Sequence, residues 1–256
     1  MSLFVAENLS KSFGGVHAVD GVSFEVHKGE VFTIVGPNGA GKSTIFNLIS
    51  RFYDVSTGRM LLDGEDITHI RPDEVIGHGI ARTFQNIELF EHSTVLANLL
   101  VGRHSRRSAN FLKNLFFLPS VRAEERAHRH AVEEVIDFLD LQAYRDKMIA
   151  GLPYGVRKVV EIGRALACGP QLLLLDEPAS GLSVEETQDV AYWIEDMQKD
   201  MGLTILMVEH DMSLVAQVSN RVLALADGKP IAIGTPAEVQ SDPRVIEAYL
   251  GMEDAA

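Results

Sequence analysis

The apolar positions along the chain change their spacing several times, and each change marks the limit of a predicted element. Near the start, short alternating stretches predict strands over 3–9 and 18–26, with a turn at 27–30. The unbroken apolar run VFTIV predicts a buried strand over 31–35. A helix is predicted over 44–52, because apolar residues recur there at helical spacing: Ile45, Leu48, Ile49 and Phe52.

After Gly169 and Pro170 the pattern alternates between strands and helices. Strand, helix, strand, helix and strand are predicted in turn at 171–176, 184–200, 203–208, 210–218 and 221–226. The first of these helices has an apolar face made of Val190, Trp193, Ile194 and Met197. Helices dominate the stretch from about 90 to 150. Because strands that alternate with helices imply a parallel sheet covered on both faces, we predict an α/β core interrupted by a helical subdomain.

The composition narrows the class of protein. The 256 residues, 46% of them hydrophobic, suffice for one large α/β domain, and the net charge of −13 argues against a nucleic-acid-binding protein. The one cysteine, Cys168, is predicted to be a small core residue in a reducing compartment. No signal peptide is expected, and no stretch approaches the ~20 apolar residues that span a bilayer. If the protein works at a membrane, we expect it to do so from the membrane surface rather than by spanning the bilayer.

A glycine-rich stretch, GPNGAGKS, joins the predicted strand 31–35 to the following helix and fits the pattern G-x-x-x-x-G-K-[ST]. Glycines allow backbone N–H groups to converge on phosphate oxygens, and the helix N-terminus adds partial positive charge. We expect Lys42 to reach the β- and γ-phosphates of ATP and Ser43 to bind Mg²⁺. The alternative, a glycine-rich turn without a ligand, is disfavoured by the strand–turn–helix context. The predicted phosphate-binding residues, here called the phosphate loop, are Gly36, Pro37, Asn38, Gly39, Ala40, Gly41, Lys42, Ser43 and Thr44.

The stretch LLLLDEP supplies the second part of the predicted site. Its leucines predict a buried strand, and Asp176 stands at the C-terminal end, where open α/β sheets bind ligands. We expect Asp176 to hold Mg²⁺ through water and Glu177 to orient or deprotonate an attacking water. The alternative is an acidic strand end exposed to solvent, which the neighbouring phosphate motif makes less favoured.

With these motifs the chain resembles the ATP-binding subunits of ABC transporters over nearly its whole length. The resemblance implies a P-loop NTPase core (ABC ATPase) with an antiparallel β subdomain and a helical subdomain, within a single domain over 1–256. Residues 1–88 and 168–256 would form the core, and about 89–167 the helical subdomain. The segment GLPYGVRK, 151–158, stands in the place of the family's signature turn and is given that name below.

The resemblance assigns roles to two further residues near the nucleotide. Phe13 looks like the aromatic residue that stacks on adenine. Gln85, in ARTFQN, looks like the glutamine that senses the γ-phosphate and links the core to the helical subdomain. It would also bind Mg²⁺ beside Ser43 and Asp176.

His210, in VEHD, looks like the family's switch histidine. The resemblance implies that it acts in catalysis together with Glu177 and Lys42, and that it couples hydrolysis to opening of the site. A lone histidine after a strand is more often a residue at a helix start, so this assignment depends on the accompanying motifs.

In this family two copies face each other head to tail, and the signature turn of one covers the γ-phosphate held by the other. The resemblance therefore implies that Tyr154 and Gly155 contact ATP bound to a second ATPase subunit, in a homo- or heterodimer. The chain departs from the family's pattern at Pro153, where serine is usual, and at Ser183, where aspartate is common. Because proline has neither a hydroxyl nor an N–H group, we expect Gly155 and the following helix N-terminus to cover the phosphate alone.

Three segments resemble the ATPase subunits of bacterial uptake systems for branched-chain amino acids: GIARTFQNIELF, the signature turn and DPRVIEAYLG. The implied partners are integral membrane permease subunits and, indirectly, a periplasmic binding protein. The chain would be cytoplasmic and peripheral on the inner face of the cell membrane, with no nucleic-acid partner. Urea or short amides are alternative substrates.

Two other classes of protein remain as alternatives, a non-transport ABC-class ATPase and a monomeric kinase or GTPase. Paired cassettes or long coiled-coil inserts are usual in the first class, and this sequence has one cassette and no heptad run. A GTPase would need an N-K-x-D motif, which the sequence lacks, and a kinase would need neither the signature turn nor His210.

The stretch 103–130 is basic within an acidic chain. Two acidic residues, Glu124 and Glu125, offset seven basic ones to leave 7 − 2 = +5: Arg103, Arg106, Arg107, Lys113, Arg122, Arg126 and Arg129. Apolar residues interleave with these charges: Phe111, Leu112, Leu115, Phe116 and Phe117. Such a stretch can bind anionic headgroups or a partner helix, or it can bury its aromatic rings while its charges are merely solvated. Both interpretations stay open.

Overall fold

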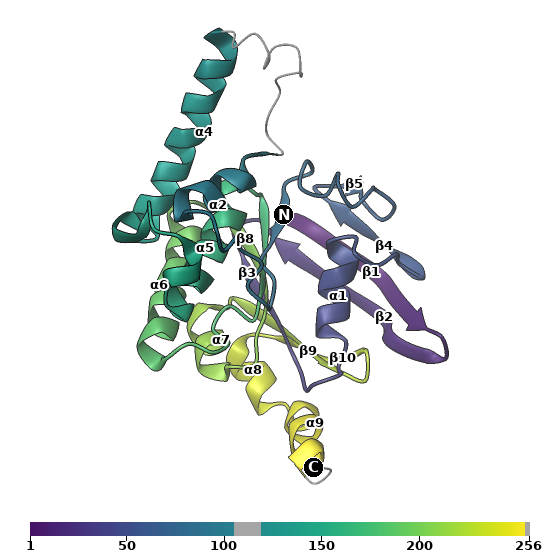
Figure 1. Ribbon diagram of the computed structural model, residues 1–256. Helices are drawn as coiled ribbons and strands as arrows, with labels where there is room; N and C mark the ends of the chain where they lie inside the picture. The colour runs from purple at the N-terminus through teal and green to yellow at the C-terminus, as the bar shows by residue number, and fades with distance from the viewer. Residues whose placement is uncertain (105–118, 254–256) are drawn as a thin grey trace.

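The structure of the chain is a computed structural model that describes residues 1–104 and 119–253. Two β-sheets form its framework (Figure 1). A four-stranded antiparallel sheet has the order β2-β1-β4-β5, with β1 Ser2–Phe13, β2 Val16–His27, β4 Thr57–Leu62 and β5 Glu65–Asp66. A six-stranded sheet has the order β10-β9-β3-β8-β7-β6, with β3 Val31–Val35, β6 Ile80–Arg82, β7 Leu172–Asp176, β8 Thr204–Val208, β9 Arg221–Ala226 and β10 Lys229–Gly234.

Within the six-stranded sheet every neighbouring pair from β9 to β6 is parallel, and only β10 pairs antiparallel with β9. The predicted parallel core sheet is therefore confirmed. Its parallel strands end at one edge, which brings together the phosphate loop after β3 and the carboxylates at the end of β7. Strand β6 lies at one edge of the sheet and pairs with β7, so the segment that follows β6 and contains Gln85 lies beside the end of β7.

The central strands are buried on both faces, which explains their unbroken apolar runs. Leu172 and Leu174 of β7 pack with helix α1, Lys42–Ile49, and with the antiparallel sheet. The intervening Leu173 and Leu175 pack with the helices on the opposite face. Those helices include α2 Val95–Gly102, α5 Tyr154–Ala167, α6 Val184–Lys199 and α7 Met212–Val218 (Figure 1). Alternate residues of one strand thus belong to two different apolar clusters.

The predicted helical stretch contains α2, α4 Pro119–Phe138 and two short 3₁₀ helices, η2 Gln142–Tyr144 and η3 Ile149–Gly151, before α5 begins. Helix α4 extends away from the two sheets (Figure 1). Within the described ranges no helix has both the length and the apolar character needed to cross a membrane. Part of the basic and aromatic stretch lies outside the described residues: Arg106, Arg107, Phe111, Leu112, Lys113, Leu115, Phe116 and Phe117.

Most of the predicted elements are found within one or two residues of their predicted limits, and Cys168 is buried as expected. The prediction for Phe52 is wrong. Helix α1 ends at Ile49 with Ser50 as its C-cap, and Arg51 has a positive φ of 58°, so the chain leaves the helical path before Phe52. The Phe52 ring is 71% exposed and packs edge-on against Tyr53 rather than into the core.

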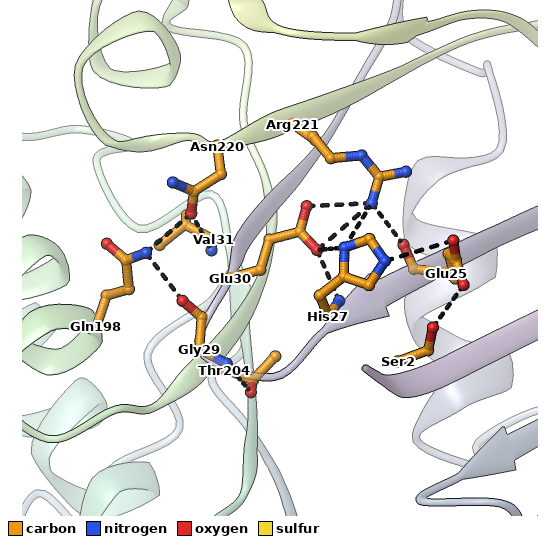
Figure 2. A network of polar contacts seen from close by, with 10 residues as sticks. All are labelled: Ser2, Glu25, His27, Gly29, Glu30, Val31, Gln198, Thr204, Asn220 and Arg221. Atoms are coloured by element: carbon orange, nitrogen blue, oxygen red, sulfur yellow. Dashed lines mark hydrogen bonds and ion pairs between the residues drawn. The ribbon is translucent and has the colours of Figure 1, made fainter.

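At the opposite end of the core sheet, a polar network joins the antiparallel sheet to β3 and β9 (Figure 2). The buried Glu30 carboxylate accepts from the His27 backbone N–H at 2.6 Å and pairs with Arg221 at 3.2 Å. Asn220 Oδ1 accepts from the Val31 N–H at 2.8 Å, so side chains satisfy backbone groups where the strands begin. The network lies at the N-terminal ends of these strands, opposite the end that carries the phosphate loop. We therefore interpret it as a structural link between the two sheets.

Candidate functional site

The phosphate loop turns sharply from β3 into α1, and two of its glycines have no room for a side chain. Gly36 has φ 150°, and a Cβ there would lie 2.2 Å from the Leu225 carbonyl oxygen. Gly41 has φ 97°, and a Cβ would lie 2.4 Å from the Ala18 carbonyl oxygen. Backbone therefore packs directly on backbone at both positions. The requirement for glycine comes from neighbouring strands as well as from any phosphate.

Lys42 is the first residue of α1, and its side chain folds back into the loop. The ammonium donates to the Gly36 carbonyl at 2.6 Å and to the Pro37 carbonyl at 2.9 Å. Burial lowers the pKa of Lys42, and the carboxylates of Glu177 and Asp176 act in the opposite direction. The loop thus holds a positive charge within a shell of backbone groups, which suits an anionic ligand.

A cavity of about 290 Å³ opens in front of this loop. Its lining combines the phosphate loop with three residues from elsewhere in the chain, Ala18 of β2, Gln85 after β6 and Glu177 after β7. The lining residues are Ala18, Asn38, Gly39, Ala40, Gly41, Lys42, Ser43, Thr44, Gln85 and Glu177. The N-cap of α1 is Gly41, so no side chain caps the first N–H groups of the helix. Uncapped N–H groups, a buried ammonium and a hydroxyl at Ser43 fit the phosphates of a nucleotide.

Asp176 lies at the end of β7 and is almost fully buried. Its Oδ2 pairs with Arg82 at 2.7 Å, and its backbone N–H donates to Thr83 Oγ1 at 3.1 Å. An oxygen of a carboxylate and the hydroxyl of Ser43 are ligands that Mg²⁺ accepts. The chemistry of the predicted donors therefore fits this metal. Ser43 and Gln85 line the cavity, whereas Asp176 is not among its lining residues. Arg82 is a partner of Asp176 that the sequence did not predict.

Glu177 follows directly and adopts a backbone conformation with φ 48°, which few non-glycine residues take. Its N–H donates to the Val208 carbonyl at 2.9 Å, so the turn is fixed by the neighbouring strand. Its Oε2 accepts from Gln85 Nε2 at 2.9 Å, although 92 residues separate the two in sequence. The structure thus brings the predicted catalytic carboxylate and the predicted γ-phosphate sensor into direct contact.

His210 lies outside this cavity. It lines a neighbouring cavity of about 350 Å³ beyond the end of β8, and its imidazole is largely exposed, with Nδ1 3.6 Å from Glu209 Oε2. Glu209 is fully buried and accepts from three backbone N–H groups, those of Ala179 at 3.0 Å, His210 at 2.8 Å and Asp211 at 3.1 Å. Glu209 therefore fixes the His210 backbone relative to the turn after Glu177. Sequence reasoning missed this residue, although an acid directly after an apolar strand was visible.

The signature turn lies at the start of α5, and none of its residues lines the cavity of the phosphate loop. Pro153 is the N-cap, with no side-chain hydrogen bond, and Tyr154 is partly exposed, with its hydroxyl donating to the Ser180 carbonyl at 3.3 Å. Gly155 is buried, and a Cβ there would lie 2.0 Å from Glu186 Oε1. A side chain at this position would therefore displace the Glu186 carboxylate of the same chain.

The departure at Ser183 has a local explanation. Ser183 is the N-cap of α6 and forms a capping box with Glu186. Its hydroxyl accepts from the Glu186 N–H at 3.2 Å, and its own N–H donates to Glu186 Oε2 at 2.9 Å. The Glu186 carboxylate that contacts Gly155 therefore also caps the N-terminus of α6.

Phe13 ends β1 and is 43% exposed. Its ring packs edge-on against Tyr53, with centroids 5.1 Å apart, and Lys11 Nζ lies 5.1 Å from the ring centre. Phe13 does not line the cavity of the phosphate loop. Its exposed ring leaves area for a stacked base, and that role stays a prediction.

Helix α5 holds the backbone around Gln85 through three side chains spaced three residues apart, a contact that sequence reasoning missed. Glu161 Oε1 accepts from the Phe84 N–H at 3.2 Å, Lys158 Nζ lies 3.4 Å from the Gln85 carbonyl, and Arg164 donates to the Glu88 carbonyl. Burial raises the pKa of Glu161. The available signal was a charged stripe on a helix face that is otherwise apolar.

Comparison with known proteins agrees with this geometry. The model of the ABC transporter family matches residues 19–180, and the model of the branched-chain amino acid ATP-binding cassette transporter matches residues 225–255. The chain is 38% identical over 243 residues to the high-affinity branched-chain amino acid transport ATP-binding protein BraF of Pseudomonas aeruginosa, covering 95% of each. It is 36% identical over 252 residues to LivG of Escherichia coli, a protein with the same description, covering 97% of this chain and 98% of LivG.

The fold agrees as well. A crystal structure of the ADP conformation of an ATP-binding cassette of an ABC transporter superposes with a TM-score of 0.85 at 35% identity. The match covers 98% of this chain and 99% of that one. The predicted fold class and the resemblance drawn from the motifs are therefore confirmed. The family match over most of the chain, together with relatives that align along nearly its full length, shows that the chain belongs to the ABC transporter family of ATP-binding cassettes.

Proposed function

We propose that this chain is the ATP-hydrolysing subunit of an importer for branched-chain amino acids, and that it works as a dimer on membrane permeases. The observation that carries the proposal is the contact between Gln85 and Glu177 at the mouth of the phosphate-loop cavity. A carboxylate that can activate water and an amide that can contact a phosphate thus lie together in a cavity that fits a nucleotide.

The hydrolytic step follows from the placement of the side chains. A water oxygen attacks the γ-phosphorus, the bond from that phosphorus to the β–γ bridging oxygen breaks, and ADP leaves with the electron pair. Glu177 orients the water and accepts its proton, while Gln85 holds one oxygen of that carboxylate. Lys42 neutralises charge on the phosphate oxygens. Mg²⁺ held by Ser43 and Asp176 would add positive charge at the same oxygens.

The remaining predicted residues act on the nucleotide from outside the cavity. Phe13 stacks on adenine, and His210 reaches the γ-phosphate only after the turn beyond β8 approaches it. Tyr154 and Gly155 meet the ATP of a second ATPase subunit through the N-terminus of α5, which carries a partial positive charge and no side-chain cap. Each reaction centre is thereby completed by the opposite copy.

The contact with the permease is proposed at a cavity of about 310 Å³ between α2, α5 and β6. Phe84 and Val101 line it and are partly exposed, so an apolar segment of the permease can pack there. Phe84 directly precedes Gln85, which lines the cavity of the phosphate loop. A movement of Gln85 when nucleotide binds would therefore be passed to Phe84 through one peptide unit. In this proposal the chain lies on the cytoplasmic face of the membrane, and a periplasmic binding protein acts indirectly.

The substrate assignment is supported by the C-terminal family match and by the relatives' descriptions. This subunit does not contact the transported molecule, so its own cavities do not select the substrate. The C-terminal match covers β10, helix α8, Pro236–Ser241, and helix α9, Pro243–Glu253. We therefore propose that branched-chain amino acids are transported, in preference to urea or short amides.

The proposal is tested with Glu177→Gln, and with Glu185→Gln on the exposed first turn of α6 as its matched control. With ATP, Glu177→Gln is expected to accumulate as a dimer on size exclusion, because nucleotide binds but is not consumed, while the control stays monomeric. In the reconstituted complex with its permeases and binding protein, the control supports ATP-dependent leucine uptake and Glu177→Gln does not. A persistently monomeric Glu177→Gln would contradict the mechanism, and uptake of urea or acetamide in place of leucine would contradict the substrate class.

A further inference from the structure

Arg82, the last residue of β6, is the centre of a buried contact network, and the sequence analysis assigned it no role although it lies in the segment ARTFQN. Its Nη2 donates to Asp176 Oδ2 at 2.7 Å. Its Nη1 donates to Asn47 Oδ1 at 2.7 Å and to Ser50 Oγ at 2.8 Å. One guanidinium group therefore connects the end of β7 with the last turn of α1 and its C-cap.

The guanidinium is also fixed between two aromatic rings. It lies 5.5 Å from the centre of the Phe46 ring on α1 and 5.3 Å from that of Phe84, which precedes Gln85. The Arg82 side chain is only 9% exposed, and its Nε is buried without a hydrogen-bond partner. An incompletely satisfied buried arginine is unfavourable as a pure stability device, because apolar residues of similar volume often stabilise at least as well. Its contacts point instead to a role in the site.

The two elements that Arg82 connects are the ones that carry the proposed metal ligands. Ser43 lies in the first turn of α1, and Asp176 ends β7. Arginine binds carboxylates in a fixed planar geometry, unlike lysine, so it can set the orientation of Asp176 relative to α1. Hydrogen bonds to a carboxylate ligand commonly orient it, and their loss costs about ten- to a hundredfold in metal affinity.

We propose that Arg82 is a positioning residue for Mg²⁺: it holds the Asp176 carboxylate in register with Ser43, and through its contact with Phe84 it ties this carboxylate to the segment that carries Gln85. The inference rests on the proposed function, in which Asp176 holds Mg²⁺. Arg82 does not line the cavity of the phosphate loop, so we expect its effect on nucleotide binding to depend on the metal.

The test measures ADP binding to the full chain by calorimetry, once with Mg²⁺ and once with EDTA. The quantity compared is the dissociation constant in EDTA divided by that in Mg²⁺, which is large when the metal strengthens binding. This metal-dependent ratio is expected to fall about tenfold or more in Arg82→Met, which keeps the length and apolar packing of the side chain but removes the donors. Arg82→Lys, which keeps the charge without the planar geometry, is expected to give a partial recovery. Binding in EDTA should stay within about twofold of the wild type in each variant, because the phosphate loop is untouched.

Asp176→Asn distinguishes a failure of this inference from a failure of the proposed metal site. If Asp176→Asn leaves the ratio unchanged, the assignment of Asp176 to Mg²⁺ is wrong and the inference falls with it. If Asp176→Asn lowers the ratio to about one while Arg82→Met leaves it unchanged, the metal site stands and the role inferred for Arg82 is overturned. An increased ratio in Arg82→Met also overturns the inference, since the arginine would then compete with the metal.

Should Arg82→Met fail to fold, Asn47→Ala removes one hydrogen-bond partner of Arg82 and keeps the ion pair with Asp176. A few-fold smaller ratio then supports the proposal, and an unchanged ratio contradicts it.

Discussion

The contact between Gly155 and Glu186 leads to a prediction in which two substitutions depend on each other. An alanine at 155 would place its Cβ 2.0 Å from Glu186 Oε1 and 2.7 Å from Glu186 Cδ, so the carboxylate must move. It cannot move freely, because Oε2 accepts from the Ser183 N–H at 2.9 Å in the capping box of α6. Gly155→Ala is therefore expected to break a hydrogen bond in another helix.

The magnitude follows from two opposing contributions. Loss of the exposed bond between Glu186 and Ser183 costs about 1 kcal/mol of the free energy of unfolding, as for other helix caps. Replacing glycine by alanine in a helix returns up to about 1 kcal/mol. Gly155→Ala alone should therefore be close to neutral. In a Glu186→Ala background no carboxylate obstructs the methyl group, so the same substitution should stabilise by up to about 1 kcal/mol.

The assay is a double-mutant cycle measured by urea unfolding of the wild type, the two single variants and the double variant. A coupling energy of about 1 kcal/mol is expected between positions 155 and 186. Gly151→Ala serves as the matched control, since a Cβ at Gly151 meets nothing within 4 Å, and its cycle with Glu186→Ala should be additive. Additivity within about 0.5 kcal/mol in the Gly155 cycle would refute the reasoning.

Two further predictions concern the same helix. Because burial raises the pKa of Glu161 above its usual 4.5, the wild type should lose free energy of unfolding relative to Glu161→Gln as pH rises from 4.5 to the folded pKa, and the difference should then level off. Urea unfolding at several pH values measures it, and a constant difference would contradict the burial argument. Pro153→Ser should leave ATPase activity within a few-fold, while Gly155→Asp, which adds a carboxylate against Glu186 and the proposed phosphate contact, should abolish it. Equal losses in a phosphate-release assay would show that both positions contribute alike.

The elements of the core could be predicted because their signals are local. A parallel strand buried on both faces appears as an unbroken apolar run, as in the leucines before Asp176, and its limits were correct to within one or two residues. The phosphate loop could be predicted for the same reason, since glycine spacing, lysine and hydroxyl occupy consecutive positions. The prediction failed at Phe52, where a positive φ at Arg51 ends the helical path without any change in apolar spacing.

The contacts around the site could not be predicted in this way. Arg82 and Asp176 are 94 residues apart, and Gln85 and Glu177 are 92 apart, so no spacing rule connects them. The strand end at Asp176 placed Glu177 in the site and the resemblance placed Gln85 there, but nothing in either argument singled out Arg82 or the buried Glu209.

The sequence by itself therefore determined the order of strands and helices and the glycine-rich phosphate loop, because each depends on neighbours within one turn or strand. Which side chains are reactive is a prediction from motifs and resemblance. The tertiary structure alone decided which of these side chains meet. The parallel pairing of β6 with β7 brings Arg82 to Asp176 and Gln85 to Glu177, and the packing of α5 against α6 sets Gly155 on Glu186. Buried charges need a partner, and only the order of strands in the sheet and the contacts between helices can supply one from so far along the chain.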